Sequence, residues 1–233
     1  MFKRAVSKST RPFWTPAGRT VVFLLAASSI GCLLGEFYQP DSMRVLALFV
    51  FLPAVAVLLA LAAVDGFWGD RRLLRGVTTG FAAGFVAAVA YDLFRLPFVF
   101  AEQWGIDAIV PPLNLFKVFP AFGALILGHA AGQTGYTLAD HITGWAYHFS
   151  NGMSFGVMFT ALLGEVARRR WVWGVAMAAG LEAGMLLTPY PRVFGIAMTS
   201  TFVVVTLAAH SIFGVVMGLS AQRLSSAWRL DRL

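Results

Sequence analysis

The chain has 233 residues, of which 58% are hydrophobic and only 12% are charged, and its mean hydropathy is +0.74. Soluble domains carry about 25% charged residues, so these values exclude an ordinary soluble globule, a disordered chain and a coiled coil. The single cysteine, Cys32, excludes an internal disulfide, a two-cysteine zinc site and a two-cysteine haem attachment. The composition predicts one integral membrane domain over residues 1–233, with the lipid bilayer as its main partner.

Apolar stretches that are long enough to cross a bilayer occur six times along the chain, since a spanning helix needs about 20 mostly apolar residues. In chain order, the predicted spans are Thr20–Tyr38, Val45–Val64, Gly76–Leu96, Ile142–Gly164, Trp171–Thr188 and Phe194–Leu219. We therefore expect an all-α, polytopic membrane helix bundle with six transmembrane helices. Residues 1–19 would form a basic cytoplasmic N-terminus, and residues 222–233 an amphipathic cytoplasmic tail.

The positions of the basic residues decide whether a further apolar stretch, 118–138, also crosses the membrane. Lys and Arg collect on the cytoplasmic side of membrane proteins. If 118–138 does not span, the 18 basic residues divide 14 to 4 in favour of the side that holds both termini; if it spans, they divide 9 to 9. The net charge of +7 is therefore an orientation signal, and no nucleic-acid partner is expected. We predict a bacterial inner-membrane protein with both termini in the cytoplasm.

Residues 97–141 then form one extracytoplasmic excursion. Its first part, 97–117, mixes four aromatic residues with two acidic ones, which is typical of a segment lying in the membrane interface. Its second part, 118–138, contains Pro120 and four glycines and is predicted to be re-entrant. Irregular backbone at membrane depth needs protein or a water-filled cavity around it, so this segment points to a site.

Ionisable side chains within the predicted spans are candidate functional residues, because a charge inside the bilayer is costly. With a rise of about 1.5 Å per residue, Asp92, His148 and Glu182 come from three different helices and lie at nearly the same depth. We expect them to converge on a polar site that faces the periplasm. The predicted binding or relay residues are Asp92, Arg95, His148, Asn151, Glu182 and His210.

Structural explanations of the same residues stay open. Asp92 and Arg95 are three residues apart on one helix and could neutralise each other. Glu182 could be a protonated hydrogen-bond partner of a neighbouring helix, because burial disfavours its charged form. His148 could be a polar contact between helices.

Three chemistries fit a convergent Asp, His and Glu. The first is a divalent metal, for which the ligands would be His148, Glu182, Asp92 and His141. The second is general acid–base catalysis, and the third is a proton relay. A haem between His148 and His210 is disfavoured, because counting from Phe194 places His210 about 24 Å deep and His148 only about 9 Å deep. The sequence identifies no cofactor.

Two H-x3-G-x3-G sequences, at 148–156 and 210–218, lie in predicted spans that run in the same direction. With Thr188-Pro189 between them, this pattern resembles that of uncharacterised YagU-like bacterial inner-membrane proteins, over about residues 142–220. The resemblance implies an inner-membrane location and a helix layout, and no activity. Because small residues four apart let helices approach closely, both glycine rows are interpreted as packing seams.

We therefore expect a membrane protein whose polar site binds or transports a metal ion, a proton-coupled solute or a lipid-like molecule. One alternative is a membrane-embedded enzyme that acts on a lipidic substrate. Another is a structural subunit of a larger membrane complex, with homo-oligomer or other membrane partners.

Overall fold

The computed structural model describes residues 13–38, 41–133 and 135–230, and these residues form helices and no strand. The predicted all-α class is confirmed. In chain order, the elements are α1 (Pro16–Tyr38), α2 (Met43–Leu46), the π-helical turn η1 (Ala47–Phe51), α3 (Leu52–Trp68), α4 (Arg72–Val99), α5 (Val118–Leu127), α6 (Leu138–Leu163), the short helical turn η2 (Val166–Arg168), α7 (Val172–Leu186), α8 (Tyr190–Val193) and α9 (Ser200–Leu230).

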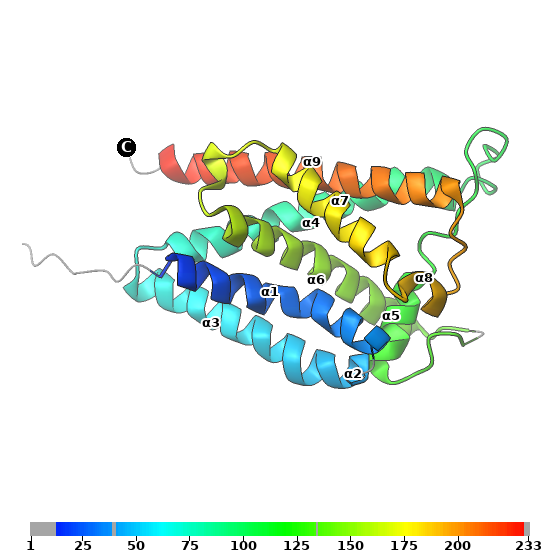
Figure 1. Ribbon diagram of the computed structural model, residues 1–233, viewed down its shortest axis with the longest axis horizontal. Coiled ribbons are helices and arrows are strands. Elements are labelled where there is room, and N and C mark those ends of the chain that lie inside the picture. The colour runs from blue at the N-terminus through cyan, green and yellow to red at the C-terminus, as the bar shows by residue number, and fades with distance from the viewer. Residues whose placement is uncertain (1–12, 39–40, 134, 231–233) are drawn as a thin grey trace, which may run out of the picture.

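The long helices lie side by side along the longest axis of the molecule (Figure 1). Helix α1, the continuous α2–α3 unit, α4, α6, α7 and α9 follow one another with alternating direction. The short helices α5 and α8 lie together at the end where α1 finishes, while α9 finishes at the opposite end, where α1 begins. The chain therefore forms a bundle with one end capped by short helices and loops.

Four helices in the described part of the chain are long and apolar enough to cross a membrane. They are α1, the unit Met43–Trp68, α4 and the part of α9 from Ser200 to Ala227. This finding indicates a membrane protein. Helix α7 has only 15 residues, and α6 carries several polar residues along its 26-residue length.

The last predicted span has the wrong bounds. It was expected over Phe194–Leu219, but α9 begins at Ser200 and runs to Leu230. Residue Gly195 has a positive φ of 56°, which breaks the helical path after α8 and creates a loop before α9. Residues 222–230 of the predicted tail continue α9, whereas residues 231–233 and the basic residues before residue 13 lie outside the described residues.

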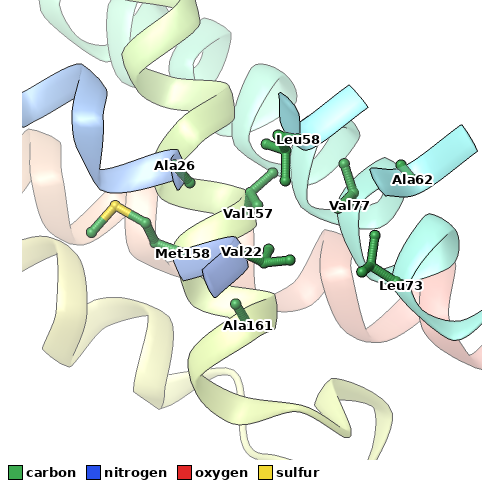
Figure 2. Packing of buried hydrophobic residues seen from close by; sticks show 9 residues of the cluster. All are labelled: Val22, Ala26, Leu58, Ala62, Leu73, Val77, Val157, Met158 and Ala161. Atoms are coloured by element: carbon green, nitrogen blue, oxygen red, sulfur yellow. The ribbon is translucent and has the colours of Figure 1, made fainter. Parts of the chain in front are cut away.

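Near the end where α1 begins, a core of small and medium-sized side chains joins four helices (Figure 2). It consists of Val22 and Ala26 from α1, Leu58 and Ala62 from α3, Leu73 and Val77 from α4, and Val157, Met158 and Ala161 from α6. All nine are buried. This cluster fixes α1, α3, α4 and α6 as one packed unit.

Glycines bring α4 and α6 into backbone contact. A Cβ on Gly84 would overlap the carbonyl oxygen of Gly152, and a Cβ on Gly156 would overlap the carbonyl oxygen of Gly80. Any larger residue at these positions would force the two helices apart. The interpretation of the first glycine row as a packing seam is confirmed.

The second glycine row packs against α7 in the same way, since a Cβ on Gly174 would overlap the carbonyl oxygen of Gly214. Farther along α7, Gly180 and Gly184 differ from Gly174. A Cβ on either would meet no atom within 4 Å, and both residues are exposed. Helix α7 is therefore held against α9 at its first turns, while its later turns leave space beside them.

The seam between α4 and α6 makes a testable prediction about stability. We expect Gly156→Ala to lower the free energy of unfolding by about 1–3 kcal/mol, the usual cost of overpacking. The matched variant Gly184→Ala adds a methyl group to open space and should leave stability unchanged or slightly raise it, because alanine favours helix more than glycine does. Thermal unfolding of both variants in detergent measures the difference. Equal melting temperatures would contradict the seam.

Candidate functional site

A cavity of about 640 Å³ lies between the helices α1, α4, α6, α7 and α9. One side of it is closed by α5 and by two loops, 112–117 and 195–199. Its volume falls within the range of about 300–1,000 Å³ that is usual for ligand sites. Most of its wall is apolar. The wall also includes polar side chains from α4, α6, α7 and α9, among them Tyr91, Arg95, His148, Asn151, Glu182 and His210.

The structure brings together three predicted site residues, Asp92, Arg95 and His148. The Nε2 atom of His148 lies 2.9 Å from Oδ2 of Asp92, across the contact between α6 and α4. The other carboxylate oxygen of Asp92 lies 3.5 Å from Nη1 of Arg95, one turn along α4. Asp92 and Arg95 are both buried, with exposed fractions of 9% and 4%. The carboxylate of Asp92 is therefore shared between an imidazole and a guanidinium.

Arg95 is held mainly by its other neighbours. Its Nη2 donates a hydrogen bond to the carbonyl oxygen of Leu115, and its guanidinium carbon lies 4.5 Å from the ring centroid of Tyr91 and 5.0 Å from that of Phe116. Aromatic faces attract a guanidinium electrostatically. Among the described residues, its Nε–H has no hydrogen-bond partner. One hydrogen-bond donor of this buried cation is therefore without an acceptor in the described structure.

Glu182 pairs with His210 instead of joining Asp92 and His148. The Nε2 atom of His210 lies 3.4 Å from Oε2 of Glu182, and its Nδ1 lies 2.9 Å from the carbonyl oxygen of Thr206. Because a carbonyl oxygen only accepts, Nδ1 carries a hydrogen and donates a hydrogen bond to the carbonyl oxygen of Thr206. The other ring nitrogen, Nε2, is then the one that faces the carboxylate of Glu182.

Tyr91 lies against both imidazoles, with its ring centroid 5.9 Å from that of His148 and 4.8 Å from that of His210. The predicted difference in depth between the two histidines is wrong, because α9 begins at Ser200 and not at Phe194. The two imidazoles flank one tyrosine, and each already faces a carboxylate. This arrangement does not offer two axial ligands to one haem.

The predicted metal set of His148, Glu182, Asp92 and His141 is not assembled. No three His, Cys, Asp or Glu side chains in the described chain lie close enough to hold a metal ion. His141 is exposed and lies two turns before His148, or about 10 Å along α6. The two acids are separated into two histidine pairs, so a site with three or four protein ligands is not supported.

The segment predicted to be re-entrant contains α5, a helix of only ten residues. Backbone contact fixes α5 on the first turns of α6, because a Cβ on Gly144 would overlap the carbonyl oxygen of Phe119. The ring of Phe119 stacks on His148, with ring centroids 4.2 Å apart. Helix α5 therefore covers the His148 side of the cavity, and this stacking partner was not anticipated from the sequence.

Asn151 follows His148 by three residues on α6 and also lines the cavity. Its exposed fraction is 9%, and its Oδ1 has no partner in the described structure. Most buried polar atoms in proteins are hydrogen-bonded, and leaving one unpaired costs about 1–3 kcal/mol. Asn151 therefore lines the same cavity as Arg95 and, like Arg95, has a buried polar atom without a partner among the described residues.

The side of the cavity near the short helices contains Lys117 and Tyr190. Lys117 Nζ donates a hydrogen bond of 2.7 Å to the carbonyl oxygen of Gly195, which ties the start of α5 to the loop before α9. Burial raises the pKa of the Tyr190 phenol well above its usual value, so Tyr190 stays neutral. Besides Arg95, the wall therefore contains a second cation, Lys117.

Tyr91 and Phe119 also belong to the site and are not among the residues predicted from the sequence. A signal for Tyr91 was present, since Tyr91 and Arg95 stand four apart on one helix and therefore share a face. No comparable signal identified Phe119, because its contact with His148 depends on how α5 docks on α6. Tertiary packing alone makes Phe119 a site residue.

The shared carboxylate of Asp92 makes a prediction. We expect Asp92→Asn to destabilise the protein by about 3–5 kcal/mol, because removing one partner of a buried ion pair leaves the other charge uncompensated. Asp107→Asn changes an exposed loop residue in the same way and should have no effect. The melting temperature in detergent is the measurement, and an equal response of the two variants would show that Arg95 does not depend on Asp92.

Comparisons with known proteins match the C-terminal part of the chain. A family model matches residues 104–231, which extend from the loop before α5 into the end of α9. His148, Asn151, Glu182 and His210 lie within that range, whereas Asp92 and Arg95 precede it. Comparisons with curated proteins and with solved structures found no match. Because the matched range exceeds half of its length, the chain belongs to DUF6789, a family of unknown function.

Proposed function

We propose that this chain is a six-span membrane protein that binds a lipid-like molecule in the cavity between α1, α4, α6, α7 and α9. One observation carries the proposal: a cavity of about 640 Å³ combines a mostly apolar wall with buried, unpaired polar atoms on Arg95 and Asn151. An amphipathic molecule needs both features, since its tail is stabilised by apolar contacts and its headgroup by a few polar ones.

The six-span arrangement adds α6 and α7 to the four helices that are long and apolar enough to span. Its support is the alternating direction of the six long elements in Figure 1. Basic residues gather at the end where α1 begins, which favours the cytoplasm there. The described ones are Arg19, Arg71, Arg72, Arg75, Arg168, Arg169, Arg170 and Arg223. The capped end then faces the periplasm of a bacterial inner membrane.

This topology is tested with reporter fusions. A reporter fused after Gly164 should read cytoplasmic, because α6 would end on that side. A fusion after Asp107 serves as the control and should read periplasmic. Seven spans would instead place residue 164 in the periplasm, so a periplasmic reading after Gly164 contradicts the six-span arrangement.

The position of the cavity favours a ligand that arrives from the bilayer. Ile30 and Leu34 of α1 line one side of it, and Gly180 and Gly184 of α7 line the other. The two glycines are exposed, and a Cβ on either would meet no atom within 4 Å. Helix α7 therefore stands apart from α1 at this level, and the cavity opens sideways between apolar helix faces. A polar solute would have to cross apolar surroundings on that route, which costs free energy.

The binding proposal is tested with dodecanol that carries a photoreactive diazirine at the end of its chain. In phosphatidylcholine vesicles, we expect labelling of α1 and α7 that excess unlabelled dodecanol abolishes, because a cavity saturates whereas the lipid-facing surface does not. Mass spectrometry of the labelled peptides measures it. Random labelling that excess dodecanol does not reduce would contradict the proposal.

A cavity-filling variant sharpens that test. Gly184→Leu places a branched side chain in the opening and should remove most of the competed labelling. Gly31→Leu is the matched control, because Gly31 is also an exposed helical glycine with no atom within 4 Å of its Cβ position, yet it does not line the cavity. If both variants label like the natural protein, the cavity is not the binding site.

A further inference from the structure

The charges around the cavity bear on the chemistry of its ligand, and this inference rests on the proposed function. In the described chain, the cavity wall contains two permanent cations, Arg95 and Lys117, and one carboxylate, Glu182. Asp92 stands behind His148 and Arg95 and is not part of the wall. The wall therefore has more permanent positive than negative charge, which is unusual inside an apolar bundle.

The carboxylates of Asp92 and Glu182 each contact a histidine. Glu182 faces His210, and Asp92 has its closer contact, 2.9 Å, with His148. The contact between Asp92 and Arg95 is longer, at 3.5 Å, and joins the second oxygen of the carboxylate. Charge-assisted hydrogen bonds between guanidinium and carboxylate are typically about 2.7–2.9 Å long. Asp92 therefore makes a looser contact with Arg95 than with His148.

The remaining contacts of Arg95 bring no further negative charge. Leu115 offers a neutral carbonyl oxygen, and Tyr91 and Phe116 offer ring faces. The Nε–H has no partner among the described residues, although Arg95 is only 4% exposed. Arg95 thus lines the cavity and has an unused, buried N–H. A guanidinium is well matched to an anionic oxygen.

We propose that the ligand is an amphiphile with a carboxylate or phosphate headgroup, and that the guanidinium of Arg95 binds its anionic oxygen. Lys117 lies on the side of the cavity that α5 and the loops close, near the periplasmic end, and adds to the positive potential inside the cavity. The apolar part of the wall, with Ile30, Leu34 and Phe155, accommodates the tail. A neutral headgroup would bring no charge to the unused donor of Arg95.

The experiment compares three diazirine probes that share one tail: dodecanoic acid, dodecyl phosphate and dodecanol. They are used at equal mole fraction in phosphatidylcholine vesicles and at a pH above the pKa of each acid. We expect competed labelling by either anion to exceed that by dodecanol by about tenfold, since a charged hydrogen bond is roughly twice as strong as a neutral one. A preference for the acid or for the phosphate then distinguishes the two headgroup types.

A variant of Arg95 tests whether this residue recognises the charge of the headgroup. Arg95→Gln should bring the anion-to-alcohol ratio close to one while dodecanol labelling persists, a selective change that loss of folding would not produce. Arg192→Gln is the matched control, because Arg192 is exposed on α8 and does not line the cavity. It should keep the full ratio. An unchanged ratio in Arg95→Gln would overturn the proposal.

A measurement on the natural protein keeps the test decisive if Arg95→Gln does not fold. With the diazirine next to the headgroup, the anionic probes should label residues 91–99 or 112–119, which surround Arg95. Labelling elsewhere would overturn the inference. Equal labelling by anions and alcohol would also overturn it and leave lipid binding intact, whereas the absence of competed labelling by all three probes would overturn the proposed function itself.

Discussion

Charged side chains inside an apolar bundle must be paired, and that constraint organises the centre of this protein. Asp92, Glu182 and Arg95 are all buried, and each meets a polar or charged partner from another element: His148, His210 and the carbonyl oxygen of Leu115. Burying an unpaired charge costs far more than a hydrogen bond returns. The helices α4, α6, α7 and α9 therefore have to align so that these partners meet, and Tyr91 fills the space between the two histidines.

Close packing elsewhere in the bundle explains why space remains beside that centre. Glycines let α4 meet α6, and α7 meet α9, at backbone distance. Two close helix pairs cannot also close every gap between them, and Gly180 and Gly184 bring no side chain that would fill it. The cavity is thus a consequence of where glycines are partnered and where they are not. The same residue type at the same spacing forms a seam in one place and an opening in another.

Contacts of the site between residues close together in the sequence could be predicted, and contacts between distant residues were harder to predict. The pairing of Asp92 with Arg95 lies within one helix and follows from their spacing. The convergence of Asp92 with His148 was expected from equal depth in adjacent spans, and the structure places them in contact. The contact between Glu182 and His210 was not predicted, because six residues before α9 were counted as helix when they form a loop, which placed His210 too deep. A small error in one helix start moved His210 by about 9 Å.

The sequence by itself determined that the chain is an all-helical membrane protein, and it also determined which residues carry charge inside the bundle. Composition and hydrophobic periodicity are local properties, and an apolar segment becomes a helix in lipid whatever its neighbours are. Only the tertiary structure decided that Glu182 pairs with His210, that Phe119 covers His148, and that Arg95 keeps an unused donor beside a cavity. Those outcomes depend on helix rotation, on helix ends and on the docking of α5. All three are set by contacts between residues far apart in the chain, which no local pattern encodes.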